Sequence, residues 1–309
     1  MMTPAFRGII PPVCTPLHDD FSVDVVSLQR ALEFLLDAGV DGVFVLGSTS
    51  EVAYLPDAQR RTVIETAVRQ VAGRVPVLAG CIDMTTLRVA EHIAVAQDAG
   101  ADAVVVTAPF YTRTHVAEIE QHFRLLHAAT GLPIFAYDIP VAVHSKLDTA
   151  MILKLAQEGV LAGLKDSSGD DSSFRYVLQG KKDRGLDGFA VFTGSELVVD
   201  NLLSIGADGA VPGLGNVDPA GYVTIFDRVR CGDQAAANAE QDRLLRLFTI
   251  VGIGDPARIG RSSAALGAFK YGMKLRGVID NAVLAPPQLP LTADEQVRIK
   301  AGLVEAGLL

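Results

Sequence analysis

In "LDAGVDGVFVLG" (36–47), a helical pattern of apolar residues ends at a glycine, and a short apolar run follows. The same pattern returns in "QDAGADAVVVTAP" (97–109) and "LSIGADGAVPG" (203–213), and more loosely in "QEGVLAGLKD" (157–166). Glycine is favoured just past a helix C-terminus. Strands that are apolar throughout are typical of parallel strands buried on both faces. The repeat therefore predicts helices that alternate with buried parallel strands.

Eight strand-then-helix units, each of about thirty residues, can be placed along the chain, as βαβ construction expects. We expect strands at 8–14, 42–47, 76–81, 103–108, 133–138, 160–165, 189–194 and 208–212. Amphipathic helices are expected at 25–38, 57–72, 85–98, 116–129, 148–157 and 195–205, and then only helices beyond about 219, around 233–253, 259–276 and 292–307. This order predicts a closed (β/α)8 barrel, or TIM barrel, at 1–232, with a C-terminal helical extension at 233–309 packed on it.

The rival arrangement is an open, doubly wound sheet, which usually carries a glycine fingerprint after its first strand. Here that strand runs into "PPVCTPL" (11–17), which has no glycine. The segment "VGIGDPARIG" (251–260) has the wrong spacing and follows no strand. The barrel is therefore favoured over the open sheet.

Composition excludes several classes of protein. The 309 residues carry a net charge of −9 without clusters of Lys and Arg, which argues against nucleic-acid binding. No apolar run reaches the roughly 18 residues of a membrane span, and the first residues lack the layout of a signal peptide. Three widely spaced cysteines give no disulfide framework. We expect a cytoplasmic protein that binds neither nucleic acid nor membrane.

Lys165 lies at the end of an apolar run in "GLKDSSGD" (163–170). Active residues of a barrel lie where strands end on the C-terminal face, and lysine is rarely buried without a partner or a purpose. Partial desolvation disfavours the ammonium form, and a neutral amine can attack a ketone to form an imine. A protonated imine is an electron sink for making or breaking the neighbouring carbon–carbon bond. The alternative is a structural lysine paired with Asp166 at the rim.

Other strand ends bring polar groups to the same mouth. Tyr137 ends the neighbouring strand in "AYDIP" (136–140), where its hydroxyl could move protons beside an imine. The turn "GSTSE" (47–51) offers the hydroxyls of Ser48 and Thr49 and consecutive N–H groups, which can hold a carboxylate. A buried structural tyrosine and a capped loop are the alternatives at these two places. Tyr111 could be simple packing.

Metal chemistry is poorly supported by the sequence. His18, His115 and His144 lie in loops after expected strands and could approach the mouth, but solvated loop histidines are commoner. The chain has no HExxH motif and no tight cluster of histidine and carboxylate at the strand ends. A metal-dependent aldolase is therefore disfavoured.

Four of these stretches together resemble the dihydrodipicolinate synthase / N-acetylneuraminate lyase family of Schiff-base lyases. "GSTSE" is similar to the family's G-[ST]-T-G-E, and "PFY" (109–111) to its P-Y-Y. "YDIP" (137–140) is similar to Y-N-x-P, and "GLKDSSGD" to G-[IVL]-K-x-[ST]-x-G-[DN]. Any one motif would be weak, but four in this order, each at a strand end, are specific. The likeness runs from "GIIPPVCTPL" (8–17) to the C-terminal helices.

The resemblance implies a role for each of these residues. Lys165 would form the imine with pyruvate or another 2-oxo acid, and Tyr137 would be the general acid and base. Ser48 and Thr49 would hold the substrate carboxylate, with the Ser48 hydroxyl relaying protons between Tyr137 and Tyr111. In the family this last tyrosine comes from a neighbouring subunit, so a homotetramer built of tight dimers is expected. The family needs no metal or organic cofactor.

The sequence also departs from the family pattern. Ser50 stands where a glycine is usual, Asp138 replaces an asparagine, and His144 lies where glycine is common. The synthase branch has an arginine two residues after the proline of Y-N-x-P, which grips the carboxylate of aspartate semialdehyde. This position is Ala142 here, which cannot make a charge-assisted contact.

Further positions look more like those of the sugar-acid lyases. Ser167 stands where these enzymes carry a hydroxyl residue near the substrate, and Glu196, in "TGSE" (193–196) with Gly194, aligns with an acidic residue that binds sugar hydroxyls. The next acidic residue of that branch is Leu197 here, which disfavours sialic acid. We expect substrate contacts at Ser167, Gly194 and Glu196 and, as substrate, a smaller 2-oxo-3-deoxy sugar acid that is cleaved or dehydrated. The alternatives are a 4-hydroxy-tetrahydrodipicolinate synthase and a non-catalytic binding protein on the same barrel.

Overall fold

Eight parallel strands form the centre of the structure, a computed structural model that describes residues 6–309. They are β1 (Gly8–Ile9), β2 (Val43–Val45), β3 (Val77–Gly80), β4 (Ala103–Thr107), β5 (Ile134–Asp138), β6 (Gly163–Asp166), β7 (Ala190–Thr193) and β8 (Gly209–Ala210). Their order in the sheet is β1-β8-β7-β6-β5-β4-β3-β2, so sequence neighbours pair from β2 to β8 and β8 returns to β1. Every strand residue is buried, as the apolar runs predicted.

The two ends of this sheet meet between β2 and the residues that follow β1. The N–H of Val13 donates to the carbonyl of Phe44 (2.8 Å), and the N–H of Phe44 donates to the carbonyl of Pro11 (3.0 Å). These bonds close the ring, and the predicted TIM barrel is confirmed. Strand β1 is shorter than the expected 8–14 because Pro11 and Pro12 have no N–H to continue a regular ladder.

In three of the four copies of the phrase, an aspartate joins two neighbouring strands near their starts. Asp102 accepts a hydrogen bond from the N–H of Val77 (2.8 Å), and Asp208 accepts one from the N–H of Val191 (2.6 Å). Asp41 does the same at the start of β1 (2.9 Å). The glycines of the phrase end the preceding helices with positive φ angles, as at Gly39, Gly100, Gly159 and Gly206. In the repeat, the glycine therefore ends a helix, and the aspartate that follows hydrogen-bonds to the backbone of a neighbouring strand.

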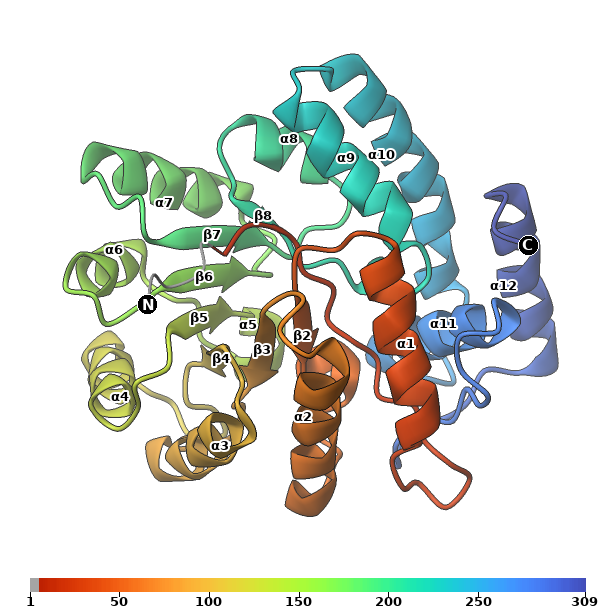
Figure 1. The fold of residues 1–309 in the computed structure, drawn as a ribbon, viewed down its shortest axis with the longest axis horizontal. Coiled ribbons are helices and arrows are strands. Elements are labelled where there is room, and N and C mark those ends of the chain that lie inside the picture. Colours follow the sequence, from red (N-terminus) through yellow and green to blue (C-terminus); the bar gives the residue numbers. More distant parts are fainter. Residues whose placement is uncertain (1–5) are drawn as a thin grey trace.

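Helices surround the strands (Figure 1). They are α1 (Val25–Asp37), α2 (Asp57–Val71), α3 (Thr86–Ala99), α4 (Val116–Ala128), α6 (Thr149–Gln157), α7 (Asp171–Asp183), α8 (Val199–Ser204) and α9 (Pro219–Arg230), with the short α5 (Pro140–Val143) after β5. Aspartates cap the starts of α1, α6, α7 and α9 by accepting from N–H groups of the first turn. The eight predicted units imply a helix after β6, but the sequence gives no range for α7, because only three apolar residues, Phe174, Val177 and Leu178, anchor its polar sequence.

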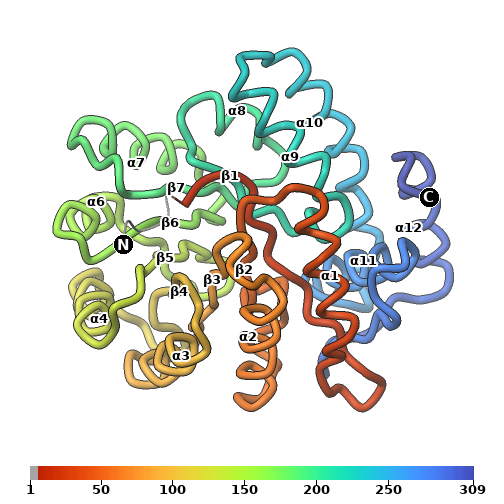
Figure 2. Tube along the Cα trace, in the orientation of Figure 1, coloured from red at the N-terminus to blue at the C-terminus, as the bar shows by residue number. Residues whose placement is uncertain are grey.

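The C-terminal extension consists of α10 (Gln234–Phe248), α11 (Arg261–Leu275) and α12 (Ala293–Glu305). Helix α10 packs along α9, and α11 packs against α12. In Figure 1 and in the tube of Figure 2, α11 and α12 lie on the side of α1, away from α4, α6 and α7. Three 3₁₀ turns complete the fold: η1 (Ser48–Ser50), η2 (Gly213–Asn216) and η3 (Thr249–Gly252). Within residues 6–309, no helix combines the length and the apolar character needed to cross a membrane.

Candidate active site

Lys165 lies inside the barrel, near the end of β6. Only 6% of the residue is exposed, and its Nζ donates a hydrogen bond to Ser167 Oγ (2.9 Å). The ammonium lies 3.7 Å from the centre of the Tyr137 ring and 5.9 Å from that of Phe44, within reach of favourable cation–π contact. Asp166, the next residue of the strand, has its carboxylate 4.0 Å from Lys146 instead. The interpretation of Lys165 as a rim residue paired with Asp166 is therefore wrong.

Tyr137 stands beside Lys165 because β5 and β6 pair these two residues in register. Burial alone would raise the pKa of the Tyr137 hydroxyl, but the Lys165 ammonium and hydrogen bonds from its neighbours bring the pKa below its ordinary value. The hydroxyl lies 3.5 Å from Ser48 Oγ. A phenol of lowered pKa beside an amine can take up and return a proton near the carbon that the amine attacks.

The turn at 47–51 carries Ser48 and Thr49 at the mouth of the barrel. Ser48 is exposed and Thr49 is half-buried, so both are accessible to a small ligand. Ser50, the departure from the family's glycine, is buried; its hydroxyl donates to the carbonyl of Val13 and accepts from the N–H of Gly47 (3.2 Å). Its backbone has no positive φ, so the serine fits the turn and ties it to the segment that follows β1.

Ser167 and Gly194 meet beside Lys165. The N–H of Gly194 donates to the carbonyl of Asp166 (2.6 Å). A side chain at position 194 would place its Cβ 2.0 Å from Ser167 Oγ, the acceptor of the Lys165 hydrogen bond. A larger residue at 194 would therefore displace the Ser167 hydroxyl from its contact with Lys165.

Glu196 is half-buried in the segment that follows β7. Its Oε1 accepts from the N–H of Leu214 (2.7 Å) and from the hydroxyl of Tyr222 (3.2 Å). Burial raises the pKa of Glu196 to about 7, although these donors and the Lys165 ammonium oppose the rise. The protein groups occupy only part of the hydrogen-bonding capacity of a carboxyl group, which can also bind a ligand hydroxyl.

Tyr111 is separate from this cluster within one chain. It is 90% exposed, and its backbone adopts a left-handed φ of 76°, which is costly for a bulky residue. With Arg113 and His144 it lines a cavity of about 620 Å³ between the loops after β4 and β5. The structure therefore brings together Lys165, Tyr137, Ser48 and Ser167, but in the described chain the ring of Tyr111 points to no hydrogen-bond partner among them.

The remaining departures from the family pattern also have structural explanations. Asp138 is fully buried, and its carboxylate pairs with Lys146 and accepts from the N–H of Leu147 (3.1 Å). Burial raises the pKa of Asp138, while the Lys146 contact opposes the rise. His144 ends α5 with a φ of 58°, a conformation that glycine adopts without strain.

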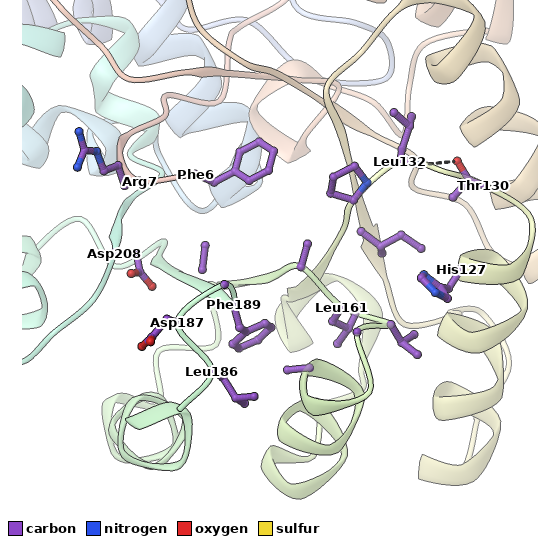
Figure 3. A pocket seen from close by; sticks show the side chains of 18 of the residues that line it. Phe6, Arg7, His127, Thr130, Leu132, Leu161, Leu186, Asp187, Phe189 and Asp208 are labelled. Atoms are coloured by element: carbon purple, nitrogen blue, oxygen red, sulfur yellow. Dashed lines mark hydrogen bonds between the residues drawn. The ribbon is translucent and has the colours of Figure 1, made fainter. Parts of the chain in front are cut away.

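A larger cavity, of about 820 Å³, lies at the opposite end of the strands. Figure 3 shows Phe6, Leu161 and Phe189 among the side chains that line it, next to the starts of β5, β6 and β7. Two acidic residues line it, Asp187 and Asp208, and Asp208 is paired with Lys181 (2.6 Å). Barrel enzymes carry their chemistry at the other end, where Lys165 lies. We therefore place the candidate active site at Lys165.

Two contributors to the site were not predicted. Phe44 lies in the uniformly apolar run of β2, where nothing distinguishes a ring beside the lysine from ordinary core. Tyr222 lies on α9, outside every strand end, so its hydrogen bond to Glu196 has no signal in the sequence. Among residues 6–309, no three side chains of His, Cys, Asp or Glu are grouped to hold a metal ion.

Comparison with known proteins agrees with this geometry. The model of the Dihydrodipicolinate synthetase family matches residues 5–306. The chain is 32% identical to a 4-hydroxy-tetrahydrodipicolinate synthase of Methanoculleus marisnigri over 85% of this chain and 90% of that protein. It is 30% identical to the "Probable 2-dehydro-3-deoxy-D-pentonate aldolase YjhH" of Escherichia coli over 98% of both chains. The crystal structure of YagE, an Escherichia coli prophage protein of the dihydrodipicolinic acid synthase family in complex with pyruvate, superimposes with a TM-score of 0.91 at 29% identity, covering 98% of this chain and 99% of YagE. The chain belongs to the dihydrodipicolinate synthetase family of lyases.

Proposed function

We propose that the chain cleaves, forms or dehydrates a 2-oxo acid through an imine on Lys165. The observation that carries the proposal is the buried lysine whose Nζ lies 3.7 Å from the ring of Tyr137 and 2.9 Å from Ser167 Oγ. An amine, a phenol and two hydroxyls at the end of parallel strands form a set suited to imine chemistry. The same family also includes the named synthase and aldolase relatives.

The proposed reaction begins with the substrate carboxylate at Ser48 and Thr49. Tyr137 in its phenolate form accepts a proton from the Lys165 ammonium, and the neutral amine attacks the C2 carbonyl carbon of the substrate. Protonation of the resulting hydroxyl expels water and leaves a protonated imine. The Ser48 hydroxyl, 3.5 Å from that of Tyr137, can relay these protons.

The imine then accepts the electron pair of a neighbouring bond. In aldol cleavage, Tyr137 removes the proton of the C4 hydroxyl, the C3–C4 bond breaks, and its electrons form an enamine on Lys165 while an aldehyde leaves. Protonation of C3 and attack of water on C2 release pyruvate and restore the lysine. In dehydration, loss of a C3 proton gives the enamine, and the C4 hydroxyl departs as water after protonation. Both routes begin with the same imine.

The groups around the imine favour a hydroxylated substrate. Ala142 offers no charge for a second carboxylate, whereas Ser167 and Glu196 offer partners for hydroxyl groups. A site built to hydrogen-bond hydroxyls disfavours analogues without them by several orders of magnitude, because buried polar groups are then left unpaired. A 2-oxo-3-deoxy sugar acid is therefore the proposed substrate class, and the relative named as a pentonate aldolase is in keeping with it.

Trapping with borohydride tests the chemistry and separates an enzyme from a binding protein. Pyruvate plus borohydride should add a reduced adduct to Lys165, and Lys165→Ala should lose both the adduct and the activity. Labelling of another lysine would refute the assignment, and the absence of any adduct would favour a non-catalytic protein.

A direct comparison of kcat/KM tests the substrate class. On one preparation, a panel of 2-oxo-3-deoxy acids should be processed far better than pyruvate with aspartate semialdehyde. Glu196→Ala should weaken use of the sugar acid but leave the pyruvate imine on Lys165 intact. If aspartate semialdehyde is the better substrate, the synthase replaces the aldolase or dehydratase as the function.

We further propose a homotetramer of tight dimers in the cytoplasm. Tyr111, strained and exposed in one chain, is in keeping with a contact to a second subunit. Free cysteines at 14, 81 and 231 fit a reducing compartment. Mass measurement in solution tests the assembly.

A further inference from the structure

Glu51 and Lys270 form an ion pair that is buried between the barrel mouth and the C-terminal extension. Glu51 follows η1 directly, and Lys270 comes from α11. Both side chains have an exposed fraction of 0%, and Glu51 Oε2 is in contact with Lys270 Nζ. The ammonium also donates to the carbonyl of Val283 (2.7 Å). A residue 219 positions away in the sequence thus neutralises the last residue of the turn at 47–51.

The other carboxylate oxygen of Glu51 is held by the same part of the chain. Oε1 accepts hydrogen bonds from the N–H of Ala285 (2.7 Å) and from Nε2 of Gln288 (2.8 Å). All these partners of the carboxylate belong to the C-terminal extension. The extension therefore holds Glu51 from three points rather than merely covering it.

The turn needs such support because its backbone is strained at both ends. Leu46 has a φ of 58° and Glu51 a φ of 60°. A left-handed conformation at a residue other than glycine costs about 1–3 kcal/mol and persists only where the surroundings fix it. Ser50 fixes one side of the turn to Val13, in the segment that follows β1. Glu51 fixes the other side to α11.

Stability alone does not account for a buried ion pair here. Desolvation of two charges offsets much of their attraction, and apolar side chains of similar volume often give equal or greater stability. What the pair adds is a defined direction and distance between α11 and the turn. That geometry matters because Ser48 Oγ lies 3.5 Å from the Tyr137 hydroxyl, at the limit of a hydrogen bond. A small displacement of the turn would break the contact.

We propose that Lys270 is a positioning residue for the substrate carboxylate: through Glu51 it fixes the turn on which Ser48 and Thr49 bind that group. The inference rests on the proposed imine chemistry and assigns the C-terminal extension a part in it. Loss of the Lys270 charge should loosen the turn and weaken binding of the carboxylate. It should leave the Lys165 amine itself able to react.

The test uses two ketones that differ in the carboxylate alone, pyruvate and its neutral methyl ester. Borohydride trapping on Lys165 is measured by mass spectrometry against ligand concentration for wild type and Lys270→Met. The half-saturating concentration of pyruvate should rise at least tenfold, with the maximal adduct retained. The concentration dependence for the ester should shift far less, because a neutral ester cannot form the charge-assisted hydrogen bonds that a carboxylate accepts.

A matched control comes from the same extension. Glu295 is buried, accepts from the N–H groups of Asp255 (2.8 Å) and Thr292 (2.7 Å), and pairs with Arg258 (2.5 Å), away from the turn. Glu295→Gln should lower thermal stability but leave the pyruvate dependence unchanged. This control separates general loosening of the extension from loss of the link to the turn.

Lys270→Met leaves Glu51 as an uncompensated buried charge, so the neutral pair Glu51→Gln with Lys270→Met is measured under the same criteria. A folded variant whose pyruvate dependence stays within twofold of wild type overturns the proposal. Equal shifts for pyruvate and the ester also overturn it, because they indicate a structural effect on the whole site. A wild-type protein without any adduct on Lys165 would instead refute the proposed function.

Discussion

At the scale of the residue, successive side chains of β5 and β6 point to opposite faces of the sheet, so that two pairs of side chains form on different sides. Tyr137 and Lys165 meet inside the barrel, while the next residues, Asp138 and Asp166, are both near Lys146. The sequence could place the tyrosine and the lysine at neighbouring strand ends because apolar runs show where strands stop. It could not predict that Lys146 neutralises Asp138, because a contact made by a loop has no periodic signal.

Removal of the Tyr137 hydroxyl should slow turnover without displacing the lysine. Tyr137→Phe keeps the ring that lies 3.7 Å from Lys165 Nζ. Loss of a general acid and base costs about 10²–10⁴-fold in rate. Steady-state kcat on the best substrate checks the prediction, with circular dichroism as the control for folding. Turnover within a fewfold of wild type would contradict the role.

Glu196 should make stability fall as pH rises through the neutral range. Its pKa in the folded chain is about 7, above the ordinary value, so between about pH 5 and 7 the native state binds a proton that the unfolded chain has released. Stability from this group is full at low pH and is lost as pH rises, by about 2 kcal/mol after solvent screening. Urea unfolding at pH 5 and pH 8 should show this loss in wild type but not in Glu196→Gln. Equal losses in both proteins would exclude Glu196 as the source.

At the scale of the element, regular helices and strands could be predicted better than the segments that shape the mouth. Helix α1 and strand β4 lie within a residue of the expected ranges, because each has a clear apolar period or run. Helix α8 begins at Val199, later than expected, because residues 195–198 run past the mouth with Glu196 instead of coiling. The conformation of such segments depends on contacts between residues far apart in the sequence, and these contacts leave no local sequence pattern.

The segment after β5 should depend on its buried ion pair. Asp138 has no exposed side-chain surface, whereas Lys146 is 33% exposed. Lys146→Met would leave a buried carboxylate near Asp166 without its cation, and removal of one partner of a buried pair costs about 3 kcal/mol. Asp138→Asn combined with Lys146→Met should recover most of this loss, because the amide oxygen can still accept from Leu147. Urea unfolding measures the free energy of unfolding of the single and the double variant. If the two variants are equally stable, the unpaired charge of Asp138 is not the cause of the destabilisation.

At the scale of the whole molecule, the barrel follows from eight repeated units, each of which leaves a buried strand beside the previous one. The glycine and aspartate of the phrase supply the helix stop and the strand link, so one pattern could predict the closed ring. The site is harder to predict from the sequence. The extension contacts the turn at 47–51 through Lys270, which lies in an ordinary helical pattern and has no feature that points to this contact.

Tyr111 provides a test of the proposed contact between subunits, because the residue is 90% exposed and its backbone has a φ of 76° in a single chain. The first turns of α3 and α5, which follow β3 and β5, also expose Leu87 (79%) and Val141 (82%), and exposed apolar side chains of this kind suit a subunit interface. If Tyr111 completes the site of a partner, inactive Lys165→Ala and weak Tyr111→Phe subunits should complement each other: a hybrid dimer has one site with both Lys165 and the partner's Tyr111. Random reassembly of equal amounts makes half of the dimers hybrid, each with one complete site, so activity should approach about a quarter of wild type. Verified hybrids no more active than the Tyr111→Phe parent would place Tyr111 in the site of its own chain, or outside the chemistry.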